Sequence, residues 1–401
     1  MNQSIAGRKG KDVRSDCWVG FTPRESGGIE LKITSKVASM YGESIRLQIL
    51  DILTALNIEN CLLELEDVGA LPFVLGARIE AAVRRSLDEQ FGKGVLNPML
   101  GWLPPFKRQC LYSTSRDRLR RSRLYLPGNE PKYFLNAGLH KPDAVILDLE
   151  DAVSPTEKDA ARVLVRNALR SIDFYGAERM VRINQGELGV MDLEWIIPHN
   201  VHVVLIPKVE EAVQIKEVEY HIHNLKTPGS KSEIFLMPII ESAKGGINAY
   251  SIATASPNIV ALAIGLEDYT ADIGVERTLE GKESFWLRSQ VVNAAKAAGI
   301  QAIDTVFSDV SDMEGLKTSV RESKSLGFEG RGCIHPRQIP IVHDAFAPTD
   351  KELAKAERIV AAFKDAEEKG LGVVSLGSKM IDPPVVKRAL KTVELAKRLK
   401  G

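Results

Sequence analysis

The stretch AVILDLEDAVSP, residues 144–155, begins with an apolar run and then places three carboxylates, Asp148, Glu150 and Asp151, within four positions. A short apolar run of this kind is typical of a strand buried on both faces. Unpaired charge is costly in such a place, so acids that end the strand need a partner or a function. The stretch therefore raises two questions, which fold holds the strand and what the acids do there.

Similar apolar runs recur from residue 122 onward and are separated by amphipathic helical stretches. The runs are SRLYLPG, AVILDLED, ERMVRIN, VHVVLIPKV, EIFLMPII, IVALAIG, QAIDTVF and GRGCIHP. Eight strands that alternate with helices predict an α/β fold, a (β/α)8 TIM barrel, over residues 121–346. A doubly wound open sheet is the alternative, but no glycine-rich dinucleotide fingerprint follows the first strand. Residues 347–401 contain two further helical stretches and are expected to form a C-terminal helical extension.

The chain before the barrel has a different texture. Within residues 1–87, GIELKITSKV and CLLELEDVG alternate like strands, and each precedes a stretch with helical spacing. This pattern predicts a small α+β domain. Residues 1–27 are rich in glycine and charge, which favours flexibility. Residues 88–120 contain prolines, glycines and a basic cluster without a sustained period, and they are expected to form a linker.

Bulk properties limit the range of functions. The chain has 401 residues, and its 53 Lys and Arg equal its 53 Asp and Glu, so no overall charge points to nucleic acid or an anionic membrane. The N-terminus lacks the apolar core of a signal peptide, and no segment is apolar enough to span a bilayer. The four cysteines are scattered without a close pair for zinc or redox chemistry. These features predict a soluble protein of a reducing compartment, most simply the cytoplasm.

Chemistry in a TIM barrel takes place at the C-terminal ends of the strands, and polar residues gather at those positions in this sequence. They are Glu150, Asp151, Arg182, Asn184, Lys208, Glu241, Glu267, Asp268 and His335. A single acid at a strand end often caps the following helix, so one such residue carries little information. Several acids together with arginine and lysine on one rim indicate a site. Two carboxylates with positions left open for water and substrate oxygens suit Mg²⁺.

Seven blocks of the barrel region resemble, in order and spacing, the citrate lyase β subunits of the HpcH/HpaI aldolase/citrate lyase family. The blocks are RSRLYLPGN, DAVILDLEDAV, VRIN, LIPKVE, PIIESAKG, GLEDYTADIG and LGFEGRGCIHPRQI. Residues 28–86 separately resemble the citrate lyase γ subunit, a small acyl carrier protein. The chain is therefore similar to a carrier-type domain fused to a lyase barrel.

The resemblance implies a Mg²⁺-dependent retro-Claisen cleavage of a citryl-type 3-hydroxyacyl thioester into oxaloacetate and an acetyl thioester. By the same resemblance Glu241 and Asp268 are the metal ligands, and Glu150 and Asp151 are second-sphere and acid–base carboxylates. Arg182 falls on the family's carboxylate-binding arginine, and Arg123 and Asn184 are candidate substrate-binding residues. A malyl-CoA or citramalyl-CoA substrate with a degenerate carrier domain is the alternative. A non-catalytic subunit of a lyase complex is a third possibility, which the metal pair and Arg182 argue against.

The N-terminal domain departs from the carrier family at the attachment motif. The γ subunit carries a CoA-derived arm on a serine, but this sequence has Arg14 at that place and Ser15 beside it. Ser15 is therefore either an ordinary surface serine or a shifted attachment site. The first of these interpretations predicts no covalent group and a free acyl-CoA substrate. The family resemblance also favours a homotrimer, and other citrate lyase subunits are candidate partners.

Overall fold

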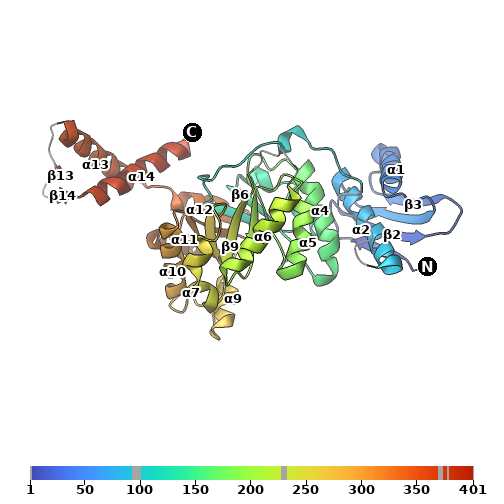
Figure 1. Cartoon of the computed structure of the whole chain (residues 1–401). Helices are drawn as coiled ribbons and strands as arrows, with labels where there is room; N and C mark the ends of the chain where they lie inside the picture. Colours follow the sequence, from blue (N-terminus) through green and yellow to red (C-terminus); the bar gives the residue numbers. More distant parts are fainter. Residues whose placement is uncertain (1, 93–100, 227–232, 369–373, 377–378, 401) are drawn as a thin grey trace.

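The computed structural model describes residues 2–92, 101–226, 233–368, 374–376 and 379–400. In chain order, a small sheet domain is followed by a barrel and then by a pair of long helices that project from the barrel (Figure 1). Among the described residues, no helix combines the length and apolar character that crossing a membrane requires.

The N-terminal domain is a four-stranded sheet with strand order β1-β2-β4-β3. Its strands are β1 (Ser4–Gly7), β2 (Cys17–Pro23), β3 (Ile29–Ser35) and β4 (Cys61–Asp67), with α1 (Ala38–Ala55) and α2 (Pro72–Phe91) beside them. The α+β prediction is confirmed for β3, α1, β4 and α2. The flexibility expected of residues 1–27 is wrong for β1 and β2, which pair antiparallel with each other. The short β1 and the charged turn after it obscured the alternation that marks a strand.

Eight parallel strands close the barrel in sequence order, which confirms the predicted TIM barrel. Each strand coincides with one of the apolar runs. They are β5 (Ser122–Pro127), β6 (Ala144–Asp148), β7 (Glu178–Arg182), β8 (Val203–Ile206), β9 (Phe235–Ile240), β10 (Ala261–Ile264), β11 (Gln301–Asp304) and β12 (Gly330–Cys333).

Helices surround the barrel and follow their strands. They are α3 (Pro131–Phe134), α4 (Lys158–Ser171), α5 (Gly186–Ile196), α6 (Ala212–Leu225), α7 (Ala243–Ile247), α8 (Ala249–Ala253), α9 (Leu266–Asp272), α10 (Phe285–Ala297), α11 (Met313–Leu326) and α12 (Gln338–Phe346). Three 3-10 turns lie at Arg108–Cys110, Ala137–His140 and Pro155–Glu157.

The N-terminal domain is fixed to the barrel by the packing of α2 against α4. Side chains of α2 enter both the core of the small sheet and the main core of the barrel. The helix α4 is buried from Ala160 to Ser171 because it is covered on both sides. Arg166 of α4 donates to Glu80 of α2 at 2.6 and 3.0 Å, and both side chains are fully buried. Buried charges are stable only when they are paired in this way.

The segment expected to be a linker is bound to the barrel along its described part. The helix α2 continues to Phe91, and residues 101–120 run along the end where the strands begin. Arg120 pairs with Glu178, the first residue of β7, at 2.7 Å, and Tyr112 donates to Ala177 O at 2.7 Å. The absence of a hydrophobic period hid these contacts, because they are made by polar groups and by backbone atoms.

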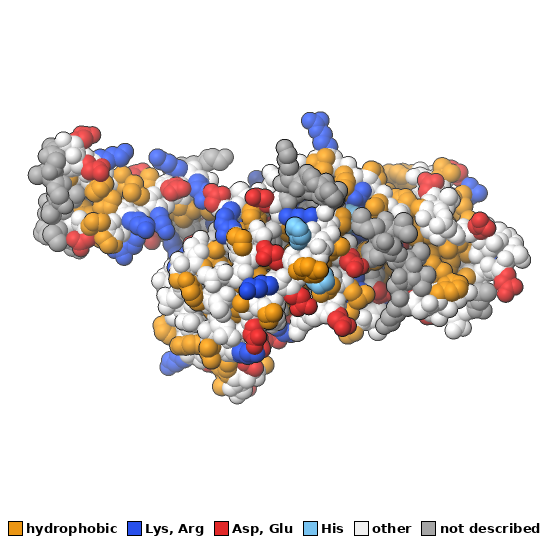
Figure 2. Space-filling view, in the orientation of Figure 1, with side chains coloured by type: hydrophobic (Ala, Val, Ile, Leu, Met, Phe, Trp, Pro, Cys, Tyr) orange, Lys and Arg blue, Asp and Glu red, His pale blue; other side chains and the backbone are white. Residues whose placement is uncertain are grey.

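The C-terminal helices α13 (Asp350–Glu368) and α14 (Pro383–Lys400) pack on each other and extend away from the barrel (Figure 1). The short strands β13 (Val374–Leu376) and β14 (Lys379–Ile381) form a two-stranded sheet between them. The space-filling view shows apolar side chains on the visible face of this pair (Figure 2). Helices in such a position are poorly covered within one chain.

Candidate active site

Predicted site residues from four different barrel strands lie together at the C-terminal rim. Asp151 follows β6, Arg182 ends β7, Glu241 follows β9, and Asp268 lies in the first turn of α9 after β10. Asp151, Arg182, Glu241 and Asp268 border one cavity of about 380 Å³. The carboxyl ends of parallel strands meet at one edge, which explains how residues so far apart in sequence converge.

Lys208 lies at the centre of this group of acids. Its Nζ is 3.4 Å from Asp268 Oδ1, 3.6 Å from Glu150 Oε1 and 3.9 Å from Asp151 Oδ1. Burial lowers the pKa of Lys208, but the three carboxylates outweigh burial and the pKa is raised. The backbone of Lys208 has φ of 50°, an uncommon value for a residue other than glycine, and its N–H donates to Glu241 Oε1 at 2.7 Å. The carboxylates at this rim thus stabilise a positively charged group that lies among them.

Of the two predicted metal ligands, Glu241 is more buried than Asp268, with 4% of its surface exposed. Burial raises the pKa of Glu241 to about 8, and the nearby charge of Asp268 adds to the effect. Gly265, which ends the turn from β10, leaves room for this carboxylate, since a Cβ there would lie 2.2 Å from Glu241 Oε2. A buried carboxylate whose charge is this costly is favoured once a cation lies beside it.

Arg182 is held by Asp148, a residue whose role the sequence left open. Its Nε and Nη2 donate to the two oxygens of Asp148 at 2.7 and 2.6 Å, a bidentate pair. The remaining Nη1 lies 2.9 Å from Glu150 Oε2, an ion pair without a hydrogen bond, and 3.4 Å from Asp151 Oδ2. Burial lowers the pKa of Arg182, but its bond to Asp148 outweighs burial and raises it. The arginine therefore fixes the acids of β6 and presents Nη1 toward them.

Asn184, a predicted substrate-binding residue, is hydrogen-bonded within the protein. Its Nδ2 and backbone N donate to Asp192 Oδ2 at 2.8 and 2.7 Å, and its Oδ1 accepts from Lys158 Nζ at 2.5 Å. Both ends of the amide are thus hydrogen-bonded inside the protein, and the substrate-binding role of Asn184 stays a prediction. The position of Asn184 at the end of a strand placed it on the rim. The sequence could not show which groups form hydrogen bonds with its amide.

Arg123 lies inside the barrel at the floor of the cavity. Its side chain is 1% exposed, and its Nη1 contacts Met237 Sδ at 3.0 Å. Tyr125, two residues later on the same strand, also borders the cavity, and its ring lies beneath Arg182 at 5.3 Å from the guanidinium carbon. Nothing in the sequence marks Tyr125 as a site residue, because an aromatic residue in a barrel strand is usually part of the core.

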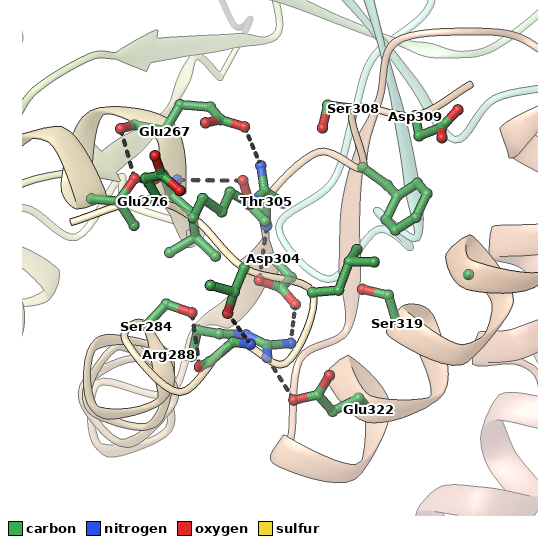
Figure 3. A pocket seen from close by; sticks show the side chains of 18 of the residues that line it. Glu267, Glu276, Ser284, Arg288, Asp304, Thr305, Ser308, Asp309, Ser319 and Glu322 are labelled. Atoms are coloured by element: carbon green, nitrogen blue, oxygen red, sulfur yellow. Dashed lines mark hydrogen bonds and ion pairs between the residues drawn. The ribbon is translucent and has the colours of Figure 1, made fainter. Parts of the chain in front are cut away.

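A second cavity of about 730 Å³ adjoins the first, and both are bordered by Leu266, Glu267, Asp304 and Thr305. Asp304, the last residue of β11, is buried and accepts from Arg288 at 2.8 Å (Figure 3). Arg288 also pairs with Glu322 at 2.8 Å, which joins α10 to α11. Through these contacts the charged side chains between the two cavities are paired with one another.

Ser15 lies at the end of the loop that joins β1 and β2. It is half-buried, has φ of 54°, and its N–H donates to Val68 O at 3.2 Å. The neighbouring Asp16 forms a buried bidentate pair with Arg78 at 2.9 Å, and Arg78 also donates to Asn129 O in the loop after β5. Arg8 of the same loop pairs with Glu130. The loop is therefore anchored beside the C-terminal rim of the barrel.

Comparison with known proteins agrees with this geometry. Residues 121–336 match the family model described as HpcH/HpaI aldolase/citrate lyase. The chain belongs to the HpcH/HpaI aldolase/citrate lyase family. Residues 6–86 match the ACP model described as malonate decarboxylase delta subunit, so the predicted carrier-like N-terminal domain is also confirmed.

Individual members of the family align with about 70% of this chain. A citrate lyase subunit beta of Leuconostoc mesenteroides subsp. cremoris is 39% identical over 286 residues, which are 70% of this chain and 95% of that protein. The mitochondrial citramalyl-CoA lyase of Rattus norvegicus is 34% identical over 70% of this chain and 87% of its own length. A crystal structure of the protein CitE from Mycobacterium tuberculosis in complex with magnesium, acetoacetate and coenzyme A is 31% identical, with a TM-score of 0.59. It covers 71% of this chain and all of that one.

The donor set at the rim fits Mg²⁺. Glu241 and Asp268 offer two carboxylates, and Lys208 shows that a positive charge is accommodated among the same acids. Within the described ranges no group of three or more His, Cys, Asp or Glu side chains is placed so that it could hold a metal ion by itself. Mg²⁺ is commonly bound through one or two carboxylates, with water or substrate oxygens as the other ligands. A closed zinc site needs more protein ligands.

Proposed function

We propose that this protein is a Mg²⁺-dependent carbon–carbon lyase that cleaves a citryl-type 3-hydroxyacyl thioester into oxaloacetate and an acetyl thioester. The observation that carries the proposal is the convergence of Asp151, Arg182, Glu241 and Asp268 on one cavity at the rim of a family barrel. Relatives named citrate lyase subunit beta and citramalyl-CoA lyase support the reaction class. A non-catalytic subunit has no need of this arrangement.

The reaction requires three changes that the site can support. The hydroxyl proton passes to a carboxylate, the carbon–carbon bond breaks, and its electron pair moves to the α-carbon of the thioester, where it forms the enolate double bond. The resulting enolate takes up a proton to give the acetyl thioester, and the former hydroxyl carbon becomes the ketone of oxaloacetate. Bound Mg²⁺ would supply Lewis-acid chemistry, since it neutralises negative charge that develops on the substrate oxygens.

Asp151 is the carboxylate we assign to proton transfer. It borders the cavity and is 54% exposed, so a substrate hydroxyl can reach it. Glu150 is buried, and its Oε1 accepts from Gln185 Nε2 at 3.0 Å. Burial raises the pKa of Glu150 despite the opposing charge of Arg182. We therefore assign Glu150 to positioning Arg182 and Lys208 rather than to contact with the substrate.

The function is tested by incubating the full-length protein with Mg²⁺ and citryl-CoA, malyl-CoA or citramalyl-CoA. Release of oxaloacetate from citryl-CoA that stops when the metal is removed by a chelator is the expected result. Release of glyoxylate or pyruvate instead assigns the chain to the malyl-CoA or citramalyl-CoA lyases. If no keto acid appears with any of the three, the assignment as a self-sufficient lyase is wrong.

We propose further that the N-terminal domain carries no covalent CoA-derived group and that the barrel accepts free acyl-CoA. Arg14 takes the place of the expected serine, and Ser15 lies in a loop fixed by Asp16 and Arg78. An exposed cation such as Arg14 suits the phosphates of a free CoA. Intact mass spectrometry of protein from its native host is expected to give the mass of the unmodified chain. An added mass that disappears with Ser15→Ala would show that Ser15 carries an arm.

The four cysteines are all free and buried. Free thiols are typical of a reducing compartment, and this supports our proposal that the protein acts in the cytoplasm.

A further inference from the structure

Arg123 is a charged residue in an otherwise apolar part of the barrel interior. It is the second residue of β5 and borders the same cavity as Glu241 and Asp268. The interior of the barrel around it is lined by apolar side chains, which are Ile146, Met180, Leu205, Met237, Ile239 and Ile303. A guanidinium in such surroundings is costly unless an anion neutralises it.

The structure provides no such anion from the described part of the chain. Arg123 Nη1 contacts the weak acceptor Met237 Sδ at 3.0 Å, and its Nε is buried without a hydrogen-bond partner. Glu178 is near enough to act on its charge, but Glu178 is already paired with Arg120 at 2.7 Å. Burial accordingly lowers the pKa of Arg123. The residue retains a positive charge that the protein itself does not use.

The two other cations of the site differ from Arg123 in this respect. Arg182 is bound by both oxygens of Asp148 and lies beside Glu150 and Asp151. Lys208 is surrounded by three carboxylates. Their charges are balanced, so an additional carboxylate placed next to either one meets competing negative charge. Among the described residues no carboxylate forms an ion pair or a hydrogen bond with Arg123, so an incoming carboxylate has that guanidinium to itself.

We infer that Arg123 binds a second carboxylate of the hydroxy acid and thereby selects a citryl thioester. This rests on the proposed function and deepens it. A citryl thioester and a citramalyl thioester differ only at the hydroxyl-bearing carbon, where a carboxymethyl group replaces a methyl group. The α-hydroxycarboxylate common to both lies among the rim acids, and the additional carboxylate of the citryl substrate reaches the floor of the cavity. The keto acid products differ in the same way, since the citryl thioester gives oxaloacetate and the citramalyl thioester gives pyruvate.

The test compares Arg123→Met with Arg331→Met in the full chain. Arg331 is also a fully buried arginine and lies on the adjacent strand β12, but it donates to Thr305 O at 3.1 Å and Ser319 Oγ at 3.0 Å. We expect Arg123→Met to lower kcat/KM for citryl-CoA by roughly 10- to 100-fold more than for citramalyl-CoA, as loss of a charged hydrogen bond predicts. Arg331→Met is expected to affect both substrates by the same factor.

Two further measurements separate binding from folding and from turnover. Calorimetric titration with Mg²⁺ present is expected to show that wild type prefers oxaloacetate to pyruvate and that Arg123→Met loses this preference. Without ligand, the Tm of Arg123→Met is expected to be no lower than that of wild type, because the variant removes an unpaired buried charge. Arg331→Met should have a lower Tm.

Equal losses with both substrates, or an unchanged preference for oxaloacetate in Arg123→Met, would overturn the inference. If wild type cleaves neither thioester, the proposed function fails, and the titration with the two keto acids still decides the role of Arg123.

Discussion

At the scale of single residues, the site consists of acids that need a cation and of cations that hold the acids in place. Glu241 illustrates the first group, since its burial raises its pKa to about 8. Asp148 illustrates the second, since it binds Arg182 with both oxygens. Charge at this rim is therefore arranged before any ligand arrives, and a preorganised arrangement is worth more in a site that excludes water.

Glu241→Gln is the substitution that tests the metal assignment. It removes one carboxylate ligand while keeping the shape of the side chain and its bond from Lys208 N. We expect a loss of roughly 1000-fold in Mg²⁺-dependent turnover, because such a ligand contributes several kcal/mol to a site of this kind. Measurements of turnover against Mg²⁺ concentration and of Mg²⁺ binding by calorimetry both report the loss.

Glu267→Gln is the matched control, since Glu267 is 61% exposed on the same rim and pairs with Arg277. Its turnover is expected to stay within tenfold of wild type. Near-normal turnover in Glu241→Gln would remove Glu241 from the set of metal ligands.

The sequence was sufficient to place Glu241 and Asp268 together, because parallel strands bring their carboxyl ends to one edge whatever the loops do. It was not sufficient for Asn184 or Asp148. Their roles depend on which of several polar neighbours a side chain meets, and that is decided by loop conformation rather than by strand order. Lys208 lies between these cases, since its position on the rim was predicted and the structure adds that the rim acids surround its amino group.

At the scale of elements, α2 and α4 form the contact on which the N-terminal domain depends. Glu80 of α2 lies between Arg166 of α4 and Arg84, at 2.6 and 2.8 Å, and is fully buried. The sequence predicted both helices from their apolar spacing. It could not predict that they pack on each other, because the charged residues that join them look like solvent-exposed positions until both faces of α4 are covered.

Removal of the Glu80 carboxylate should destabilise the protein strongly. Glu80→Gln leaves the buried guanidinium of Arg166 without its counter-ion, which typically costs about 3–5 kcal/mol. Denaturant unfolding of the full chain is expected to show this loss in the free energy of unfolding.

The exposed pair of Lys9 and Glu66 offers a comparison, and Glu66→Gln should change the free energy of unfolding by less than about 1 kcal/mol. If the two variants are equally stable, the buried pair does not hold the domains together.

The segment 101–120 introduces a pH dependence through two buried histidines. Arg170 Nη1 donates to His199 Nδ1 at 3.1 Å, and His202 Nε2 lies 2.8 Å from Tyr112 O. Burial, aided by nearby arginines, lowers the pKa of each to about 3. An unfolded histidine titrates near 6.5, so below that pH the unfolded chain binds more protons than the folded chain.

Stability should therefore be constant above pH 6.5 with respect to these groups and fall as the pH decreases toward 3. The expected slope is about 1.4 kcal/mol per pH unit for each histidine well below pH 6.5. Unfolding measured from pH 7 to pH 4 should show a shallower slope in His199→Gln and in His202→Gln. The exposed His223 serves as the reference, since His223→Gln should leave the slope as it is in wild type. An unchanged slope in all three variants would mean that the two buried rings are protonated in the folded state.

At the scale of the whole molecule, the pair of helices α13 and α14 extends from the barrel with a small core of its own (Figure 1). Large apolar side chains are exposed on the barrel as well, including Ile247, Tyr250, Phe285 and Trp286. Surfaces of this kind are usually covered by another molecule. On this ground, and from the family resemblance, we propose a homotrimer in which α13 and α14 cover a neighbouring site.

Light scattering of the full chain is expected to give three times the 44.1 kDa of one chain. Deletion of residues 347–401 should lower turnover, and dilution into the nanomolar range should lower it in wild type as the assembly dissociates. Full turnover from a species of one chain's mass would exclude this arrangement.

The attachment of the N-terminal domain to its barrel has a kinetic consequence. A carrier that moves on a tether reaches its targets at an effective concentration set by the length of that tether, and it can serve several targets in turn. Here Asp16, Arg78 and Asn129 fix the β1–β2 loop beside one rim. A ligand bound by this loop therefore stays at a constant distance from the barrel. It does not diffuse on a tether, and it does not reach other targets in turn.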